Sequence, residues 1–227
     1  MKFFHLSDLH IGLKLVNRDL RDDQLDIFTK IAGAAKAEQP DAVIIAGDIY
    51  DKSVPSAEAV DLFDAFVSAL REAAPQAEIM MISGNHDSGS RLNVFRSVLC
   101  RQKVHMIGLP PQTDKDQIEK VTLSDQYGRV NFFLLPFVKP SMVKQIVGTD
   151  ENRNNLSYDE TLHRLIGREK LYPIIARAEY NAAIPLLLDG EQYIGAVSGG
   201  GDGSFQDLLR QAIEMAVEDG QTSTSML

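Results

Sequence analysis

The sequence predicts an α/β fold in which sheets and helices form layers, and three observations predict it. Short apolar runs alternate with helical stripes through the first half of the chain, and hairpin patterns follow in the second half. Alternation of this kind favours parallel strand pairing, because a helix must carry the chain back to the same end of the sheet. The 227 residues are 44% apolar and 24% charged, which excludes a disordered chain and a disulfide scaffold.

The first half contains four predicted strands with helices between them. The strands are expected at residues 2–6, 42–46, 78–83 and 104–107. The run at residues 42–46 is β-branched and uninterrupted, as in strands that are buried on both faces. Apolar residues recur at helical spacing over residues 25–35 and 63–70, and Ser56 is the expected N-cap of the second helix. A further short helix is expected over residues 92–99.

The pattern changes after two consecutive prolines at positions 110 and 111. Apolar runs at residues 121–123 and 130–135 flank a polar turn and predict an antiparallel hairpin. Ser157 and Glu160 have the spacing of a capping box, which predicts that a helix begins there.

The chain is expected to divide near residue 171. We interpret residues 1–171 as the main domain and residues 172–227 as a tail of different character. The tail contains a second predicted hairpin over residues 184–197, a glycine-rich connector and an amphipathic helix that Ser204 caps.

Charge and cysteine usage restrict the environment and the partners. A net charge of −9 is unfavourable for general nucleic-acid binding, although basic clusters or metal ions can reverse the sign at one site. The single cysteine, Cys100, and the missing secretory signal indicate a reducing cytoplasm. Cys100 is expected to be a small buried residue. No apolar run is long enough to span a membrane.

Three polar clusters each follow a predicted strand. Ligands of open α/β sheets bind beyond the carboxyl ends of the strands, so these clusters are expected to meet at one edge. Carboxylate, imidazole and amide groups are typical ligands of divalent metals. Each cluster alone is common in ordinary loops, and the three together predict a metal site. The clusters are Asp8 and His10, then Asp48, then Asn85, His86 and Asp87.

These motifs, Asp-x-His, Gly-Asp and Gly-Asn-His-Asp, resemble the opening of the calcineurin-like metallophosphoesterases. Residues 4–12, 46–51 and 82–88 are similar in finer detail to the SbcD-type DNA nuclease subunits, and the similarity covers roughly residues 1–171. The resemblance implies a layered metallophosphoesterase-type β-sandwich flanked by helices, in a form that is incomplete relative to the family.

The resemblance also implies a two-metal site. Asp8 and His10 would hold one Mn²⁺, Asp48 would bridge to a second Mn²⁺, and Asn85 would bind that second ion. Such a pair of ions orients a phosphate, lowers the pKa of a bound water and neutralises developing charge.

By the same resemblance, His86 is the catalytic imidazole and Asp87 is the carboxylate that orients it. Basic residues that follow the first and third motifs, Lys14, Arg18 and Arg91, are candidate contacts for DNA phosphates. A solvated surface is the alternative interpretation of each of these three.

The function implied is a Mn²⁺-dependent DNA exonuclease or endonuclease that processes DNA ends with an SbcC-type SMC-like ATPase. Homodimerisation is a further expectation from the family. Two alternatives stay open: a calcineurin-like phosphoesterase with a small substrate, and a non-catalytic fragment that scaffolds a partner.

The histidine count favours an impaired site. The family adds three further histidines, two of them in a Gly-His-x-His motif, which does not occur among the five histidines of this sequence. His163 lies in a predicted helix and is not expected to be a ligand. We therefore expect this chain alone to bind metal weakly and to cleave DNA poorly.

Overall fold

The structure is a computed structural model that describes residues 1–168, except residues 17 and 95, and the backbone of residues 183–188 and 191–197. The predicted connector, which begins at residue 198, and the predicted amphipathic helix that follows it lie outside the described residues.

The first sheet is parallel throughout, with the strand order β1-β4-β5-β6. Its strands confirm the four runs predicted from the sequence. They are β1 (Phe3–Leu6), β4 (Ala42–Ala46), β5 (Glu78–Ile82) and β6 (Val104–Ile107).

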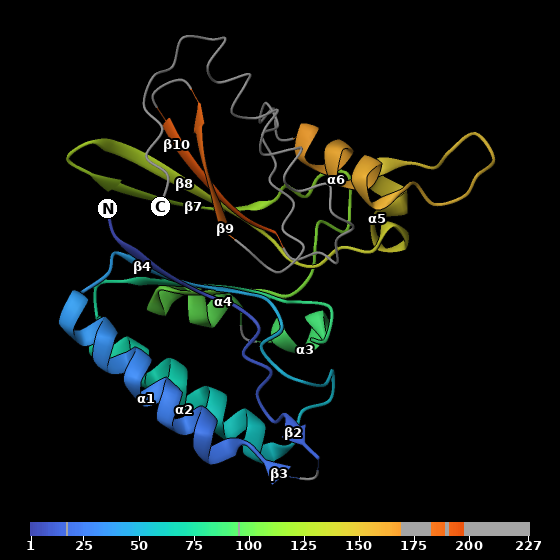
Figure 1. Ribbon diagram of the computed structural model, residues 1–227. Coiled ribbons are helices and arrows are strands. Elements are labelled where there is room, and N and C mark those ends of the chain that lie inside the picture. Colours follow the sequence, from blue (N-terminus) through green and yellow to red (C-terminus); the bar gives the residue numbers. More distant parts are fainter. Residues whose placement is uncertain (17, 95, 169–182, 189–190, 198–227) are drawn as a thin grey trace.

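Two long helices, α1 (Arg21–Glu38) and α2 (Ala57–Ala73), cover one face of this sheet (Figure 1). The Ser56 hydroxyl accepts a hydrogen bond from the amide of Ala59 at 3.3 Å, which confirms the predicted cap.

The second sheet packs against the other face of the first, so the two sheets form a sandwich (Figure 1). Its strand order is β7-β8-β10-β9, in which both predicted hairpins pair antiparallel and β10 runs parallel to β8. The strands are β7 (Glu119–Asp125), β8 (Gly128–Leu135), β9 (Ala183–Leu188) and β10 (Glu191–Val197).

Successive side chains of the central strands point to opposite faces of the sheet and so pack against both neighbouring layers. In β4, Val43 and Ile45 face the helices, whereas Ile44 faces the second sheet. In β8, Phe132 faces the first sheet, whereas Leu135 belongs to a third apolar cluster, separate from the clusters on the two faces of the first sheet. Because β4 is covered on both sides, all five of its residues are buried, as the sequence predicts.

The third cluster lies under α5 (Pro140–Val147) and α6 (Tyr158–Gly167), which flank the second sheet (Figure 1). The Ser157 hydroxyl accepts from the Glu160 amide at 3.1 Å, so the predicted start of α6 is confirmed. Helix α5 was not predicted from the sequence. The layered α/β fold is confirmed.

Two short regions differ from the expectation. One continuous helix was expected over residues 92–99. The structure instead has two short helices and a 3₁₀ turn in this region: α3 (Gly89–Leu92), α4 (Arg96–Leu99) and η1 (Cys100–Gln102). The break follows Asn93, whose side chain accepts from the Gly108 amide at 2.8 Å and ties the chain to the end of β6. A ribbon of β2 (Lys14–Leu15) and β3 (Arg18–Asp19) was not predicted. In the described part of the chain, no helix has the length and apolar character needed to cross a bilayer.

Candidate metal centre

The loops that follow β1 and β4 run side by side beyond the sheet. The His10 amide donates to the Asp48 carbonyl at 2.9 Å, and the Ile11 amide donates to the Ile49 carbonyl at 2.9 Å. The Asp51 amide donates back to the Ile11 carbonyl at 3.2 Å. These bonds continue the parallel pairing past the strand ends, so they bring the first two motifs together as the sequence predicts.

Asp8, His10 and Asp48 form a cluster with one potential ligand atom each within 4.8 Å of one another. The Nε2 atom of His10 lies 3.9 Å from the Asp8 carboxylate and 4.0 Å from the Asp48 carboxylate. Ligands at about 2.1 Å from one ion lie roughly 3.0–4.2 Å apart, depending on their angle. The two separations from His10 lie within this range, so the three side chains are placed where they could converge on one divalent ion.

The same three residues have left-handed backbone. Their φ angles are 55° at Asp8, 42° at His10 and 46° at Asp48. This region costs a residue with a Cβ atom about 1–2 kcal/mol relative to right-handed backbone. Strain of this kind often occurs at functional sites, where the surrounding structure holds it in place.

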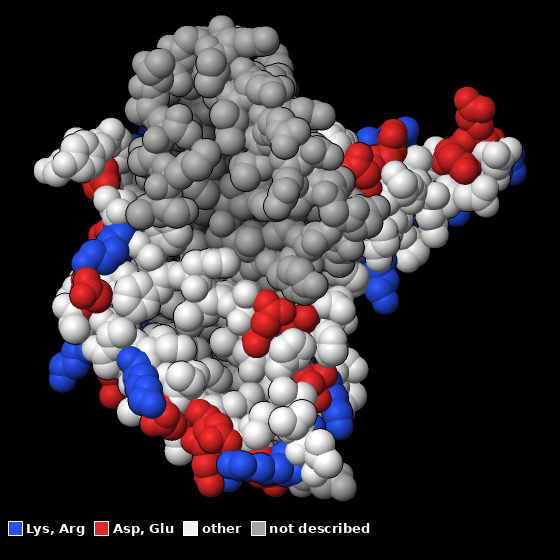
Figure 2. Space-filling view, in the orientation of Figure 1, with Lys and Arg blue, Asp and Glu red and all other residues white. Residues whose placement is uncertain are grey.

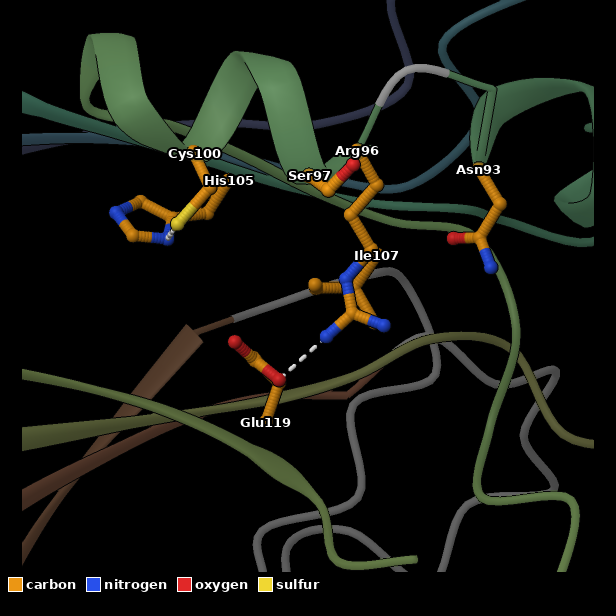
Figure 3. Close-up of a pocket in the computed structure, with 7 residues that line it drawn as sticks. All are labelled: Asn93, Arg96, Ser97, Cys100, His105, Ile107 and Glu119. Carbon is orange, nitrogen blue, oxygen red and sulfur yellow. Dashed lines mark hydrogen bonds and ion pairs between the residues drawn. The ribbon is translucent and has the colours of Figure 1, made fainter.

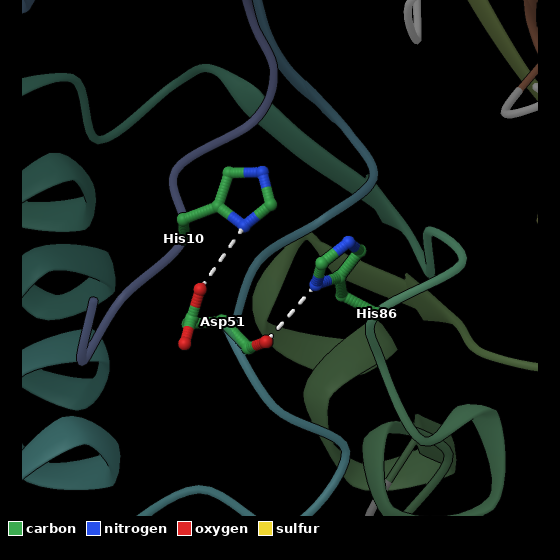
Figure 4. Close-up of side chains that lie close together, drawn as sticks. All are labelled: His10, Asp51 and His86. Carbon is green, nitrogen blue, oxygen red and sulfur yellow. Dashed lines mark hydrogen bonds and ion pairs between the residues drawn. The ribbon is translucent and has the colours of Figure 1, made fainter. Parts of the chain in front are cut away.

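A second cluster contains His10, Asp51 and His86 (Figure 4). The Nδ1 atom of His10 is buried and makes no hydrogen bond in the described part of the protein, although the Asp51 carboxylate lies 3.7 Å away. A buried ring nitrogen without a donor or acceptor partner fits a site that is completed by a cation.

The third motif places His86 beside this cluster. Its ring lies edge-on to the His10 ring with centroids 4.8 Å apart, and its Nδ1 is 3.0 Å from the Asp51 carbonyl (Figure 4). That hydrogen bond raises the pKa of the His86 imidazole, and the negative charges of Asp48, Asp51 and Asp87 add to the increase.

Asn85 also contacts the centre. One atom of its side-chain amide lies 3.0 and 3.2 Å from the two carboxylate oxygens of Asp48. With nitrogen at that position, the amide donates to the carboxylate; with oxygen there, three oxygens converge as they do around a cation. The position of Asn85 is thus compatible with the predicted ligand role.

Asp87 has different contacts from those expected. Its carboxylate accepts from the amides of Ile49 at 3.0 Å, Tyr50 at 2.9 Å and Gly84 at 2.8 Å. The imidazole of His86 is instead bonded to the Asp51 carbonyl, so the orienting role expected for Asp87 stays a prediction. Asp87 ties the third loop to the second.

Burial around this contact affects two titrating groups. Desolvation raises the pKa of the Asp87 carboxyl, against the opposing effect of its three amide donors. Desolvation, with the nearby charges of Asp87 and Asp64, raises the pKa of Tyr50 to about 12.

Gly84 allows the second and third loops to approach each other. A Cβ atom at this position would lie against the side-chain oxygen and amide of Asp48, with Asp48 Cγ at 2.6 Å. Only glycine leaves room for that carboxylate.

The predicted DNA-binding residues lie outside these two clusters. Lys14 lies 3.6 Å from the Asp19 carboxylate and Arg18 lies 3.6 Å from the Asp23 carboxylate, so both charges are partly compensated. Arg91 is an exposed residue of α3. On the face shown in Figure 2, acidic and basic side chains are interspersed.

Two further histidines have structural contacts elsewhere. His105 pairs with Glu78 at 2.8 Å, and His163 lies on α6 with its ring 2.9 Å from the Asp159 carbonyl. The expectation that His163 is a helix residue is confirmed.

Comparison with known proteins decides the family. The family model of the calcineurin-like phosphoesterases matches residues 1–200. The chain belongs to the calcineurin-like phosphoesterase family. This match includes β9 and β10, which pair into the second sheet, whereas the division at residue 171 stays a prediction.

Two curated relatives of this calcineurin-like phosphoesterase are named as the D component of the nuclease SbcCD. The protein from Staphylococcus saprophyticus is 38% identical over 138 residues, which make up 60% of this chain and 34% of that protein. The protein from Staphylococcus epidermidis is 35% identical over 144 residues, 63% of this chain and 36% of that protein. Each match therefore covers about a third of the relative.

Sequence reasoning missed one residue of the site, Asp51. It lies in the motif Gly-Asp-Ile-Tyr-Asp, three residues after Asp48, and the second acidic residue of that motif was the available signal. Its contacts with His10 and His86 depend on how the loops pack, which the local pattern does not reveal.

Proposed function

We propose that this chain is a metal-dependent phosphodiesterase that cleaves DNA, with Mn²⁺ as its ion. The observation that carries the proposal is the convergence of Asp8, His10 and Asp48, with His86 beside them. Membership of the calcineurin-like phosphoesterases supports the phosphoesterase chemistry. The relatives named as nuclease components support DNA as the substrate.

In this proposal, Asp8, His10 and Asp48 would hold one ion, and Asp48 together with Asn85 would contribute to holding a second. Bound divalent ions would polarise the scissile phosphate and favour deprotonation of a water. The residues supply a rigid frame for this chemistry, because backbone bonds between the loops fix the ligands before substrate arrives.

His86 is the proposed catalytic imidazole. Its Nδ1 lies within hydrogen-bond distance of the Asp51 carbonyl, which accepts a hydrogen bond but cannot donate one, so Nδ1 carries the hydrogen. When the ring is protonated, Nε2 also carries a hydrogen, and it is the position from which a proton or a hydrogen bond reaches a phosphate or leaving oxygen. Asp87 acts as a positioning residue, because it joins the backbone of the third loop to that of the second.

We further propose that the second ion is held weakly by this chain. His10 and His86 are the histidines in the two clusters found among the described residues, and both clusters share His10. With few donors left for a second ion, its affinity and the cleavage rate of the chain alone should both be low.

Lys14, Arg18 and Arg91 are the proposed contacts with DNA, where their charges would neutralise phosphates. The affinity of the protein for DNA should therefore fall as the salt concentration rises. An SbcC-type SMC-like ATPase is the proposed partner, by analogy with the names of the relatives, and a homodimer is the proposed assembly.

The deciding experiment measures cleavage of duplex DNA by the purified chain with Mn²⁺. Asp48→Ala is the test variant, and Asp61→Ala, an exposed position on α2, is the matched control. We expect slow cleavage that survives in the control and disappears in the test variant. Equal rates in all three proteins would refute the assigned site.

A chromogenic phosphodiester assayed in parallel separates the substrate classes. Faster turnover of the small ester than of DNA would favour a small-substrate phosphoesterase. Absence of both activities, with metal bound, would favour the scaffold interpretation. Calorimetric titration tests the weak second site: two tightly bound Mn²⁺ ions per chain would contradict it.

A further inference from the structure

Cys100 lies in a different environment from the one its sequence predicts. The residue is exposed, not buried, and it begins the turn η1 directly after α4. Its sulfur lies 3.8 Å from Nδ1 of His105, a residue of β6 (Figure 3). The other ring nitrogen of His105, Nε2, lies 2.8 Å from a carboxylate oxygen of Glu78 on β5.

The carboxylate of Glu78 fixes the tautomer of this imidazole. An ionised carboxylate only accepts hydrogen bonds, so Nε2 of His105 must carry the hydrogen that they share. In the neutral ring Nδ1 is then the proton acceptor, and it is the atom that faces the Cys100 sulfur. The three side chains have the order nucleophile, base and orienting carboxylate that activates a thiol.

These residues are distinct from the metal centre. Glu78 is the first residue of β5 and His105 is the second residue of β6, near the amino ends of the strands. The metal-centre loops follow the carboxyl ends of β1, β4 and β5. The two groups of side chains therefore belong to opposite ends of the parallel sheet.

An open pocket of about 520 Å³ lies beside the sulfur (Figure 3). Cys100 and His105 line it together with Asn93 and an ion pair of Arg96 with Glu119, whose closest atoms are 2.5 Å apart. Figure 3 shows the Arg96 and Glu119 side chains facing each other across this space. The volume is within the range of small-molecule sites, and amide and guanidinium groups can bind the carboxylates or amides of a ligand.

We propose that Cys100 is a thiol-exchange site that takes a low-molecular-weight disulfide bearing carboxylates. His105 Nδ1 accepts the thiol proton as the Cys100 sulfur attacks one sulfur of the disulfide. A bond forms between the two sulfurs, the disulfide bond breaks, and the departing thiolate recovers the proton from His105. One disulfide and one protein thiol are thereby converted into a mixed disulfide and a free small thiol, with no further oxidant.

Two properties of the chain favour this chemistry over others. The sequence has one cysteine, so no second thiol of the same chain can displace the adduct, which persists until an external thiol reverses it. The pocket provides room for a disulfide beside the sulfur, whereas oxidation by a peroxide requires no pocket. Glu78 is a positioning residue, since it acts on the sulfur only through His105.

The test measures mixed-disulfide formation with oxidised glutathione at pH 7, using the mass of the intact chain. The unique cysteine assigns every adduct, and Cys100→Ser is the blank. A free thiol is only a few per cent ionised at this pH, so complete proton transfer raises the rate at most about 30-fold. We expect the native protein to react about tenfold faster than His105→Asn, because the variant lacks the base that accepts the thiol proton.

Two further measurements separate activation from a structural effect. Glu78→Gln should also react more slowly, and both variants should show a steeper rise of rate with pH than the native protein. Arg96→Gln should slow the reaction with oxidised glutathione but not with neutral hydroxyethyl disulfide.

A comparison within the unmodified chain avoids any failure of the variants to fold. The native protein should react several times faster than the same protein unfolded in urea, although unfolding exposes the thiol fully. Equal or slower reaction of the native protein would overturn the proposal. So would unchanged rates in folded His105→Asn and Glu78→Gln proteins.

Discussion

The Asp87 carboxylate joins two loops of the metal centre, so its removal should affect both stability and metal binding. Asp87→Ala would leave the amides of Ile49, Tyr50 and Gly84 without their acceptor. All three residues are buried. An unsatisfied buried donor costs about 1–3 kcal/mol.

The expected loss in the free energy of unfolding is at the lower end of the total for three unsatisfied amide donors. Asp87 itself is partly exposed, so water can reach some of the freed amides. Burial raises the pKa of this carboxyl, which means that its removal also relieves a desolvation cost. We expect Asp87→Ala to lower the free energy of unfolding by about 3–5 kcal/mol. Asp87→Asn keeps the shape and one acceptor oxygen, so it should cost about 1–3 kcal/mol.

Urea denaturation followed by circular dichroism measures both losses. Asp61→Ala, on the exposed face of α2, is the control and should stay within about 0.5 kcal/mol of the unmodified protein. A 3–5 kcal/mol loss corresponds to a fall in Tm of roughly 6–20 °C for a chain of this size. If Asp87→Ala unfolds within about 0.5 kcal/mol of the unmodified protein, the three amide bonds do not hold the loops together and the reasoning fails.

Three other substitutions test a loop contact at the candidate site, the packing between the two sheets and a helix cap. Gly84→Ala places a Cβ atom against Asp48, so the affinity for Mn²⁺ measured by calorimetry should fall more than about tenfold. The free energy of unfolding should also fall by about 1–3 kcal/mol because the site is overpacked. An unchanged affinity would contradict the contact. Phe132→Ala empties the space between the two sheets and should cost about 3–5 kcal/mol in urea denaturation; a cost below about 1 kcal/mol would mean that the sheets do not pack there. Ser157→Ala removes the acceptor for the Glu160 amide and should cost about 1 kcal/mol by the same assay, with Ser157→Asp as the retained-cap control.

Local patterns predicted most elements of the fold because their signals are contained in short segments. The run at residues 42–46 has no polar residue to mark a solvent face, and β4 occupies those same positions. Ser56 and Ser157 each lie directly before a helix, and each accepts the amide three residues later. Helix α5 was missed although Pro140 at its start, with Val143 and Val147 on one face, provided a signal.

The sequence predicted which side chains come together at the candidate site, but it did not predict the individual contacts that they make. The strand-end positions of Asp8, His10 and Asp48 follow from topology, and the structure brings these side chains together. The partners of Asp87 lie up to 38 residues away in another loop, where no spacing rule applies. The pairing of Cys100 with Glu78 through His105 likewise depends on which strands become neighbours.

The left-handed backbone at Asp8, His10 and Asp48 bears on any attempt to engineer a more heat-resistant form of this protein. Glycine adopts this conformation without strain, so each exchange could gain about 1–2 kcal/mol of backbone energy. Each exchange would also delete a side chain of the proposed metal site. A library selected on thermal survival alone would therefore accumulate changes that empty the centre, as in other trade-offs between stability and activity. Selection for heat resistance needs a cation-binding readout at every round.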